Sequence, residues 1–366
     1  MNATIEKNRT PEKSQVSDGM RANSRAVRIA LDVMGADHGP DKIVSGGVIA
    51  AQELGEDVAL TLVGDAEAIE KSLLELGSRP QNITCHHAPN VVLMSDSPAE
   101  AVRKSNTSVA LGLELQREGK VDAFVSAGNT GAMMAGSLLR LGRIPGVNRP
   151  AICALFPTKN FKTTLALDVG ANAECKPLNL AQFGALGSAY ISAMYGIERP
   201  KVGLLSIGQE RVKGNTLIAR SYELMEKSNL NFIGNVEGKD ILSGDVDVVV
   251  TDGFTGNITL KFAESIESFL TTRIRHQVST NIFSRVGAAL MSPFLGRLRR
   301  AFDYAEAGGA PLLGIEGVTI VCHGASSPRA IKNGLSLAVR MVRTETLENT
   351  RKQMRENDLL RTGHDR

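Results

Sequence analysis

This sequence of 366 residues has no tryptophan, four tyrosines and four cysteines, and each scarcity excludes a class of function. Proteins that bind single-stranded nucleic acid stack bases on aromatic side chains and follow the backbone with positive charge. The net charge here is only +3, and no basic stretch alternates with aromatic residues, so the sequence predicts no nucleic-acid partner. The cysteines are widely scattered and no Cys-x-x-Cys occurs, which is typical of a reducing compartment and predicts neither disulfides nor a metal site.

Long apolar runs are missing as well. No stretch reaches the roughly 18 consecutive apolar residues of a membrane span, and residues 1–26 lack the apolar core of a signal peptide. We therefore expect a cytoplasmic protein in which 1–26 form a disordered extension. A charged tail over 344–366 leaves 27–343 as the folded α/β domain.

Several catalytic motifs are absent too. There is no G-x-x-x-x-G-K-[ST], which excludes a P-loop kinase. After the first expected strand stands Met34-Gly-Ala-Asp37 in place of Gly-x-Gly-x-x-Gly, which disfavours dinucleotide binding. Phe124 occupies the position where a G-x-S-x-G nucleophile elbow needs its first glycine, so Ser126 is not expected to be a hydrolase nucleophile. These absences favour chemistry that needs no cofactor and no activated protein nucleophile.

What the chain does have is a regular alternation of strand and helix signals from Val27 onward. Many strand segments are continuously apolar, as expected for strands buried on both faces of a parallel sheet. The alternation predicts an α/β fold with a doubly wound, mostly parallel sheet and a cleft at the carboxyl ends of the strands. The expected strands are 27–32, 58–63, 121–125, 151–157, 163–169, 202–207, 231–234, 246–251 and 317–321. The expected helices include 42–55, 67–76, 97–118, 178–195, 216–227, 258–275 and 328–347.

One strand-to-helix junction is typical of an anion site. The strand 121–125 runs into Ser126-Ala-Gly-Asn-Thr-Gly-Ala132, and a helix follows directly. The first turn of a helix has unpaired N–H groups and the positive end of the helix dipole. Glycines let the backbone approach a ligand closely, and Ser, Asn and Thr add hydrogen-bonding groups. This junction is therefore suited to holding phosphate.

Polar loops follow other strand ends in the same way. For a single loop, turn chemistry and helix capping are a sufficient explanation. Because we expect seven such loops at the same edge of one sheet, a shared site is favoured. The loops are 32–40, 168–177, 206–216, 235–240, 251–257, 308–314 and 322–326. Basic and amide groups around a phosphate-sized hole suit a reaction in which phosphate itself attacks, since an anionic nucleophile needs positioning and charge balance.

From about Val27 to Val342 the chain closely resembles the bacterial acyl-ACP:phosphate acyltransferases of phospholipid synthesis, where ACP is acyl carrier protein. The motifs that carry the resemblance are DVMGADHGP, SAGNTGA, DVGANAECKP, SIGQERVKGN, NVEGKD, TDGFTGN, GGAPLLG and CHGAS, in that order. The resemblance implies transfer of a long-chain acyl group from the carrier protein to inorganic phosphate. It also implies a homodimer, a fold similar to phosphate acetyltransferases and isocitrate-type dehydrogenases, and a membrane acyltransferase that passes the acyl group of the product to glycerol 3-phosphate.

On this reading the loop over 126–130 holds phosphate, and Asn172, Lys176 and Lys213 close around it. Lys176 or Lys213 neutralises phosphate and stabilises the tetrahedral oxyanion, beside Asn172. His323, at a strand end, is the expected donor to the leaving thiolate, and a capping or core role for this histidine is the alternative. The other expected substrate-binding residues are Ser126, Gly128, Asn129, Thr130, Gly131, Arg211, Asp252 and Asn257.

The segment 281–305 differs in kind from the rest of the chain. It is amphipathic, with Pro293 dividing it into two short helices, and it predicts a protruding helical hairpin with an apolar tip and a basic rim. Such a tip would contact anionic lipid at the inner face of the cell membrane and also the acidic carrier protein. A hairpin packed in a dimer interface or core is the alternative. The expected contact residues are Leu290, Phe294, Leu295, Arg297, Leu298, Arg299 and Arg300.

Three other functions remain open on the sequence. One is a short-chain phosphate acetyltransferase that uses coenzyme A. Another is a metal-dependent decarboxylating dehydrogenase, although no aspartate cluster or nicotinamide pocket can be placed. The third is a membrane scaffold without catalysis, which would not need so many small polar loops.

Overall fold

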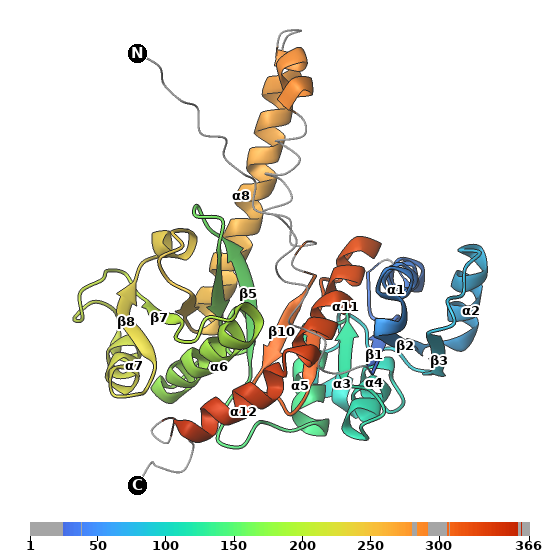
Figure 1. Ribbon diagram of the computed structural model, residues 1–366, viewed down its shortest axis with the longest axis horizontal. Helices are drawn as coiled ribbons and strands as arrows, with labels where there is room; N and C mark the ends of the chain where they lie inside the picture. The colour runs from blue at the N-terminus through green and yellow to red at the C-terminus, as the bar shows by residue number, and fades with distance from the viewer. Residues whose placement is uncertain are drawn as a thin grey trace, which may run out of the picture.

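The computed structural model describes residues 25–37, 39–279, 284–291, 306, 308–357 and 360. The expected extension over 1–26 lies almost wholly outside these residues. So does most of the expected tip, including Phe294, Leu295, Arg297, Leu298, Arg299 and Arg300. Figure 1 shows a wide α/β body from which the long helix α8 (Gly253–Ser279) protrudes.

The body is built on one sheet of eleven strands in the order β3-β2-β1-β4-β11-β10-β5-β6-β9-β7-β8. Seven of its ten strand pairs are parallel, which confirms the predicted mostly parallel sheet. The strands are β1 (Val27–Asp32), β2 (Val58–Gly64), β3 (Ile83–His87), β4 (Ala123–Ser126), β5 (Ala151–Pro157), β6 (Thr163–Leu167), β7 (Lys201–Leu205), β8 (Asn231–Val236), β9 (Val248–Val250), β10 (Ala310–Leu313) and β11 (Val318–Val321).

The two ends of the sheet run in opposite directions. β10 is antiparallel to both β11 and β5, and β6 is antiparallel to β5. The strands β6, β9, β7 and β8 therefore point opposite to β1, β2, β3, β4 and β11. Their carboxyl ends lie at opposite edges of the sheet. The prediction that all seven polar loops share one edge is wrong for this reason.

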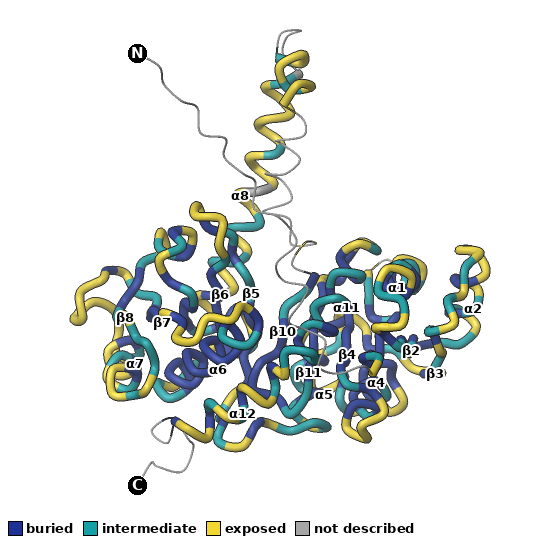
Figure 2. The backbone as a smooth tube through the Cα atoms, in the orientation of Figure 1, coloured by how far each residue is buried: buried dark blue, intermediate teal, exposed yellow. Residues whose placement is uncertain are grey.

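Helices cover both faces of the sheet, and the strand residues alternate between them. In β4, Ala123 and Val125 belong to the cluster that includes residues of α1, α6 and α11, whereas Phe124 packs with α4 and α5. Figure 2 shows the buried backbone concentrated in the sheet and in α6. The remaining helices are α1 (Pro40–Leu54), α2 (Ala66–Glu75), α3 (Pro98–Arg103), α4 (Ser108–Arg117), α5 (Thr130–Arg140), α6 (Pro177–Tyr195), α7 (Thr216–Glu226), α11 (Pro328–Arg343) and α12 (Thr346–Glu356).

Some of the elements differ from the sequence prediction. The expected helix 97–118 is two helices, because Asn106 takes a positive φ of 54° and Thr107 begins a new helix as its cap. The expected helix 328–347 is interrupted where Glu345 takes a φ of 50°. The loop 308–314 contains β10, and residues 83–87 form β3; the sequence analysis left out both strands.

The C-terminal segment is part of the body as far as the structure describes it. Helix α12 packs against α6, and Met354 and Leu360 are fully buried. The tail predicted over 344–366 thus contributes to the core through these two apolar residues, while Glu348, Lys352 and Arg355 are exposed.

Helix α8 has 27 residues, which corresponds to about 40 Å of helix. Large apolar side chains are exposed along it, among them Phe254, Ile258, Phe262 and Phe269. Even so, none of the helices in the described part of the chain combines the length and the apolar character needed to cross a membrane.

Candidate functional site

The predicted site residues fall into two groups at opposite edges of the sheet. We call the carboxyl ends of β1, β4 and β11 the serine edge, and those of β6, β7, β8 and β9 the lysine edge. The serine edge holds Ser126, Gly128, Asn129, Thr130, Gly131 and His323. The lysine edge holds Asn172, Lys176, Arg211, Lys213, Asp252 and Asn257. Because the two groups lie at opposite edges of the sheet, the structure does not bring them together in one site within a single chain.

At the serine edge, the loops after β1 and β4 hold one another. The Ser126 Oγ donates to the Asp32 Oδ2 at 2.7 Å and accepts from the Gly128 N–H at 3.0 Å. A Cβ on Gly35 would lie 2.6 Å from the Gly128 Cα, so only glycine allows this approach. Asp32 is fully buried, and burial raises its pKa although the surrounding hydrogen bonds oppose the rise. Ser126 is therefore used to join these loops.

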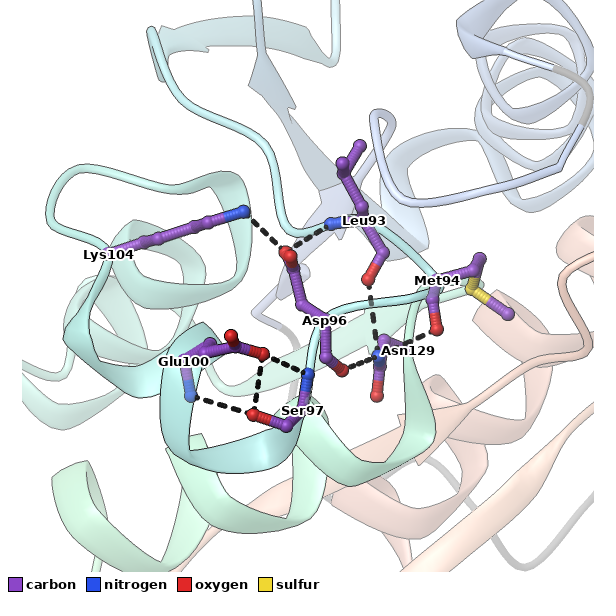
Figure 3. A network of polar contacts seen from close by, with 7 residues as sticks. All are labelled: Leu93, Met94, Asp96, Ser97, Glu100, Lys104 and Asn129. Atoms are coloured by element: carbon purple, nitrogen blue, oxygen red, sulfur yellow. Dashed lines mark hydrogen bonds and ion pairs between the residues drawn. The ribbon is translucent and has the colours of Figure 1, made fainter.

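Asn129 is likewise occupied, as Figure 3 shows. Its Oδ1 caps α5 by accepting from the Ala132 N–H at 3.0 Å. Its Nδ2 donates to the carbonyls of Leu93, Met94 and Asp96 at 3.2, 3.1 and 2.8 Å. The side chain therefore binds the loop 93–96 to the start of α5.

Two predicted side chains at the serine edge remain accessible. Thr130, the first residue of α5, is exposed. The exposed His323 accepts from the Ala325 N–H at its Nδ1, at 3.1 Å. Because this edge contains neither Lys176 nor Lys213, His323 does not lie beside the predicted phosphate-binding lysines of its own chain.

At the lysine edge, a buried carboxylate organises the loop after β6. Asp168 is fully buried and accepts from the N–H groups of Ile152, Gly170, Ala171 and Asn172, at 2.6 to 3.3 Å. It also accepts from the Asn172 Nδ2 at 2.9 Å. Burial raises the pKa of Asp168, and these hydrogen bonds act against that rise.

Asn172 serves the same loop rather than facing solvent. Its Nδ2 donates a second hydrogen bond to the Pro150 carbonyl at 2.7 Å, and its side chain is buried. Its Oδ1 is a buried acceptor with no hydrogen-bond partner among the described residues. The structure thus holds Asn172 in a fixed position within the loop.

The first turn of α8 packs directly on this loop. The Gly253 N–H donates to the Asn172 carbonyl at 2.8 Å, and Asp252 caps the helix by accepting from the N–H and Oγ1 of Thr255. A Cβ on Gly256 would lie 1.9 Å from the Asp168 carbonyl oxygen, so this position requires glycine. Asn257 is exposed beside Gly170. The glycines of TDGFTGN therefore set the contact between α8 and the loop after β6.

The loop after β7 presents Lys213. Its carbonyl accepts from the Ser206 Oγ at 3.2 Å and from the Asn235 Nδ2 at 3.4 Å, and its N–H donates to the Glu210 carbonyl at 2.9 Å. The backbone is fixed while the side chain is exposed. Asn235, which the sequence analysis did not single out, is buried in this role; its place at the end of β8, within NVEGKD, was the available signal.

Lys176 lies at the start of α6 in a similar arrangement. Its N–H donates to the Asn179 Oδ1 at 2.7 Å, and its side chain is exposed. Neither Lys176 nor Lys213 is in an ion pair among the described residues. By contrast, Arg211 pairs with Glu226 at 3.0 Å and lies over the Tyr222 ring, so its charge is already matched.

The lysine edge combines these two ammonium groups with three helix N-termini. Helices α6, α7 and α8 begin at the carboxyl ends of β6, β7 and β9, which are neighbours in the order β6-β9-β7. Strand spacing of about 4.8 Å places the β6 and β7 loops about 10 Å apart. The positive ends of three helix dipoles and two lysines together favour an anion at this edge.

By residue type, Cys175 is the candidate nucleophile adjacent to Lys176 in sequence. Burial raises the pKa of its thiol to about 12, and the nearby carboxylate of Asp168 adds to the rise. A thiol with this pKa is protonated near neutral pH and is a poor nucleophile. In the described parts of the chain, no three histidine, cysteine or acidic side chains are grouped so as to hold a metal ion.

Comparison with known proteins identifies related chains. A model of the family described as fatty acid synthesis protein matches residues 27–349. The phosphate acyltransferase of Myxococcus xanthus is 49% identical over 320 residues, covering 86% of this chain and 90% of that protein. The phosphate acyltransferase of Heliobacterium modesticaldum is 48% identical over 314 residues, covering 85% and 93%.

Among solved structures, a phosphotransacetylase from Streptococcus pyogenes matches with a TM-score of 0.58 at 16% identity, covering 89% of this chain and 95% of that one. This likeness concerns the fold alone. It confirms the predicted doubly wound α/β fold similar to phosphate acetyltransferases.

Proposed function

Because this chain belongs to the fatty acid synthesis protein family, whose curated members include phosphate acyltransferases, we propose that it transfers a long-chain acyl group from an acyl carrier protein to inorganic phosphate. The chain is an acyltransferase. The short-chain alternative is not favoured, because the phosphate acyltransferases are 48–49% identical to this chain and the phosphotransacetylase shares only 16%.

The observation that carries the site assignment is the convergence of Lys176, Lys213 and three helix N-termini at the lysine edge. Phosphate held there has its charge balanced. One of its oxygens attacks the thioester carbonyl carbon, and the lysines stabilise the oxyanion that forms on the carbonyl oxygen. The C–S bond then breaks, the sulfur of the carrier takes up a proton, and acyl phosphate remains.

We expect acyl phosphate when the protein is mixed with palmitoyl carrier protein and phosphate. Trapping with hydroxylamine converts this product to a hydroxamate that mass spectrometry identifies. Acetyl-coenzyme A in place of the carrier protein is expected to give little product. Hydroxamate from acetyl-coenzyme A but none from the palmitoyl donor would contradict the proposal and favour the short-chain alternative.

The same proposal includes a homodimer and a peripheral place at the inner face of the cell membrane, where a membrane acyltransferase takes over the acyl phosphate. What supports the membrane contact is the position of exposed apolar residues beyond the long helix α8. Val286, Leu290 and Met291 are 55%, 76% and 54% exposed. Apolar side chains at the end of a projection can enter the lipid headgroup region.

For the proposed homodimer, we expect sedimentation velocity to give the mass of two chains. A mass of one chain would refute the homodimer.

Glutamate at both Leu290 and Met291 is expected to release the protein from anionic liposomes, because charge at the lipid contact opposes insertion. Flotation of liposomes with bound protein measures this. The matched control is Leu74→Glu, since Leu74 is 79% exposed on α2, within the body. Equal flotation of the double variant, the control and the wild type would rule out membrane contact through these residues.

A further inference from the structure

Strand β8 contains a bulge that changes which face of the sheet its later side chains occupy. Val202 in β7 pairs with Phe232, but the next residue, Gly203, pairs with Gly234, so β8 has one residue more than β7 at this point. Gly234 takes a positive φ of 95° there. An extra residue of this kind bends the strand and redirects the side chains that follow it.

The core contacts on either side of the bulge show this change of face. Side chains alternate along a strand, so Phe232 and Val236, four residues apart, would share a face in a regular strand. Phe232 packs with the cluster that includes residues of α6 and α7, and its ring meets that of Tyr222 on α7 edge-on, with centroids 5.0 Å apart. Val236 belongs to the cluster on the other face, against which Leu260 of α8 packs. The bulge therefore turns Asn235, the neighbour of Val236, toward the face that α7 covers.

On that face Asn235 contacts the loop that leads from β7 to α7 and carries Lys213. Asn235 is 5% exposed. Its Nδ2 donates to the Glu210 carbonyl at 2.9 Å and, more weakly, to the Lys213 carbonyl at 3.4 Å. The Lys213 carbonyl also accepts from the Ser206 Oγ at 3.2 Å, and the Lys213 N–H donates to the Glu210 carbonyl. One buried amide thus holds both ends of the turn 210–213.

The backbone of this turn also sets where the side chain of Lys213 begins. A Cβ on Gly208 would lie 3.0 Å from the Lys213 Cγ, so the first carbons of the lysine side chain pack against the backbone of Gly208. Directly after the lysine, Gly214 takes a φ of 109°, and a Cβ on it would lie 2.8 Å from the Ile218 Cβ. The chain can therefore turn this closely into α7 only with glycine at 214. The Lys213 ammonium is thus presented on a stem whose position the loop determines.

We propose that Asn235 is a positioning residue for Lys213, and that the bulge in β8 aims it at the loop that carries this lysine. The inference rests on the proposed function, in which the Lys213 ammonium balances the charge of phosphate and stabilises the oxyanion. Asn235 is buried and acts through Lys213, whose backbone its amide holds. Hydrogen-bond donation, rather than shape, is what the position requires, because both partners of the Asn235 Nδ2 are carbonyl oxygens.

Alanine at Asn235 is expected to lower kcat/KM for acyl phosphate formation about tenfold or more and to raise the KM for phosphate, because a misplaced charged group lowers the rate strongly. In the Lys213→Ala background the same substitution should cost less than about twofold, since the group that Asn235 positions is already absent. Asn235→Asp keeps the shape but has oxygen in place of the donor, so we expect it to lose as much activity as alanine. The hydroxylamine assay measures all of these rates, and thermal unfolding checks the fold of each variant.

The matched control is Asn231→Ala. Asn231 is the first residue of β8, and its Nδ2 donates to the Arg199 carbonyl at 2.9 Å, so the same kind of hydrogen bond is lost at the other end of the strand. We expect a change in rate of less than about twofold, because this bond is far from the Lys213 loop. If the Asn235 variants do not fold, Ser206→Ala removes the other side-chain donor to the Lys213 carbonyl and replaces Asn235→Ala in the cycle.

A loss of rate that is equally large with and without Lys213, in whichever of these variants folds, would overturn the proposal. Wild-type activity in folded Asn235→Asp would also overturn it, because packing alone would then suffice. Failure of the wild-type protein to form hydroxamate from any acyl carrier protein is a distinct result, which would overturn the proposed function and this inference together.

Discussion

Alanine at Lys176 or at Lys213 is expected to lower acyl phosphate formation about 100-fold, the usual effect of losing one charge or oxyanion contact. Both lysines have fixed backbones and exposed ammonium groups, and neither has a carboxylate partner among the described ion pairs. The hydroxylamine assay measures the rate, and circular dichroism with thermal unfolding checks that the fold is kept.

The matched control for both variants is Lys239→Ala. Lys239 follows β8 at the same edge and is also exposed, but its ammonium pairs with Glu237. Its charge is already balanced, so we expect less than a threefold loss of rate. Wild-type turnover in both the Lys176 and the Lys213 variants would show that phosphate binds elsewhere. An equal loss of rate in the Lys239 variant would show that acyl phosphate formation requires positive charge at this edge in general, rather than at these two positions.

Alanine at Asp168 is expected to lower the free energy of unfolding by about 4 kcal/mol or more. Five donors reach this carboxylate, four from the backbone and one from the Asn172 side chain. A buried donor left without a partner costs about 1–3 kcal/mol, and several are lost together. Urea denaturation at constant pH measures the change.

The matched variant for this position is Asp168→Asn. An asparagine at this position keeps one oxygen that can accept some of the five hydrogen bonds, while its NH₂ group faces the Asn172 donors. We therefore expect a smaller loss in the free energy of unfolding than with alanine. A loss below about 1 kcal/mol for the alanine variant would mean that water replaces the carboxylate without cost. The Asp168 hydrogen bonds would then not be what holds the loop after β6.

Strand positions could be predicted from local pattern, and strand direction could not. The apolar runs gave β1 and β5 with their observed bounds. β10 has only four residues, one of them a proline, and it lies between Gly308, Gly309 and Gly314, all with positive φ, so the segment has the composition of a loop. Which strands pair, and in which sense, depends on contacts far apart in sequence. The sequence therefore did not indicate that the strand direction reverses at β10 and β5. It also did not indicate that the candidate site residues lie at two opposite edges of the sheet.

The sequence showed which residue types lie at the candidate site, but it did not show their hydrogen-bond and ion-pair partners. Ser126 and Asn129 have the expected types for an anion loop, yet their polar atoms bind Asp32 and the carbonyls of 93–96. Arg211 was expected to bind substrate, but Glu226, one helix further along the chain, pairs with it. Lys176 and Lys213 stay candidates because the fold places them in the same region and leaves their charge unmatched.

The order of strands also affects how the chain assembles during synthesis. β11 lies between β4 and β10, and α11 packs on α1, so the amino-terminal strands gain their last neighbours from residues beyond 308. Until the ribosome has made that segment, β4 is an open edge strand with unpaired backbone groups. The strands β6, β7, β8 and β9 lie within residues 163–250 and can pair as soon as they emerge. We therefore expect the middle of the polypeptide to fold first, and the amino-terminal part to need protection from aggregation until the carboxyl-terminal part arrives.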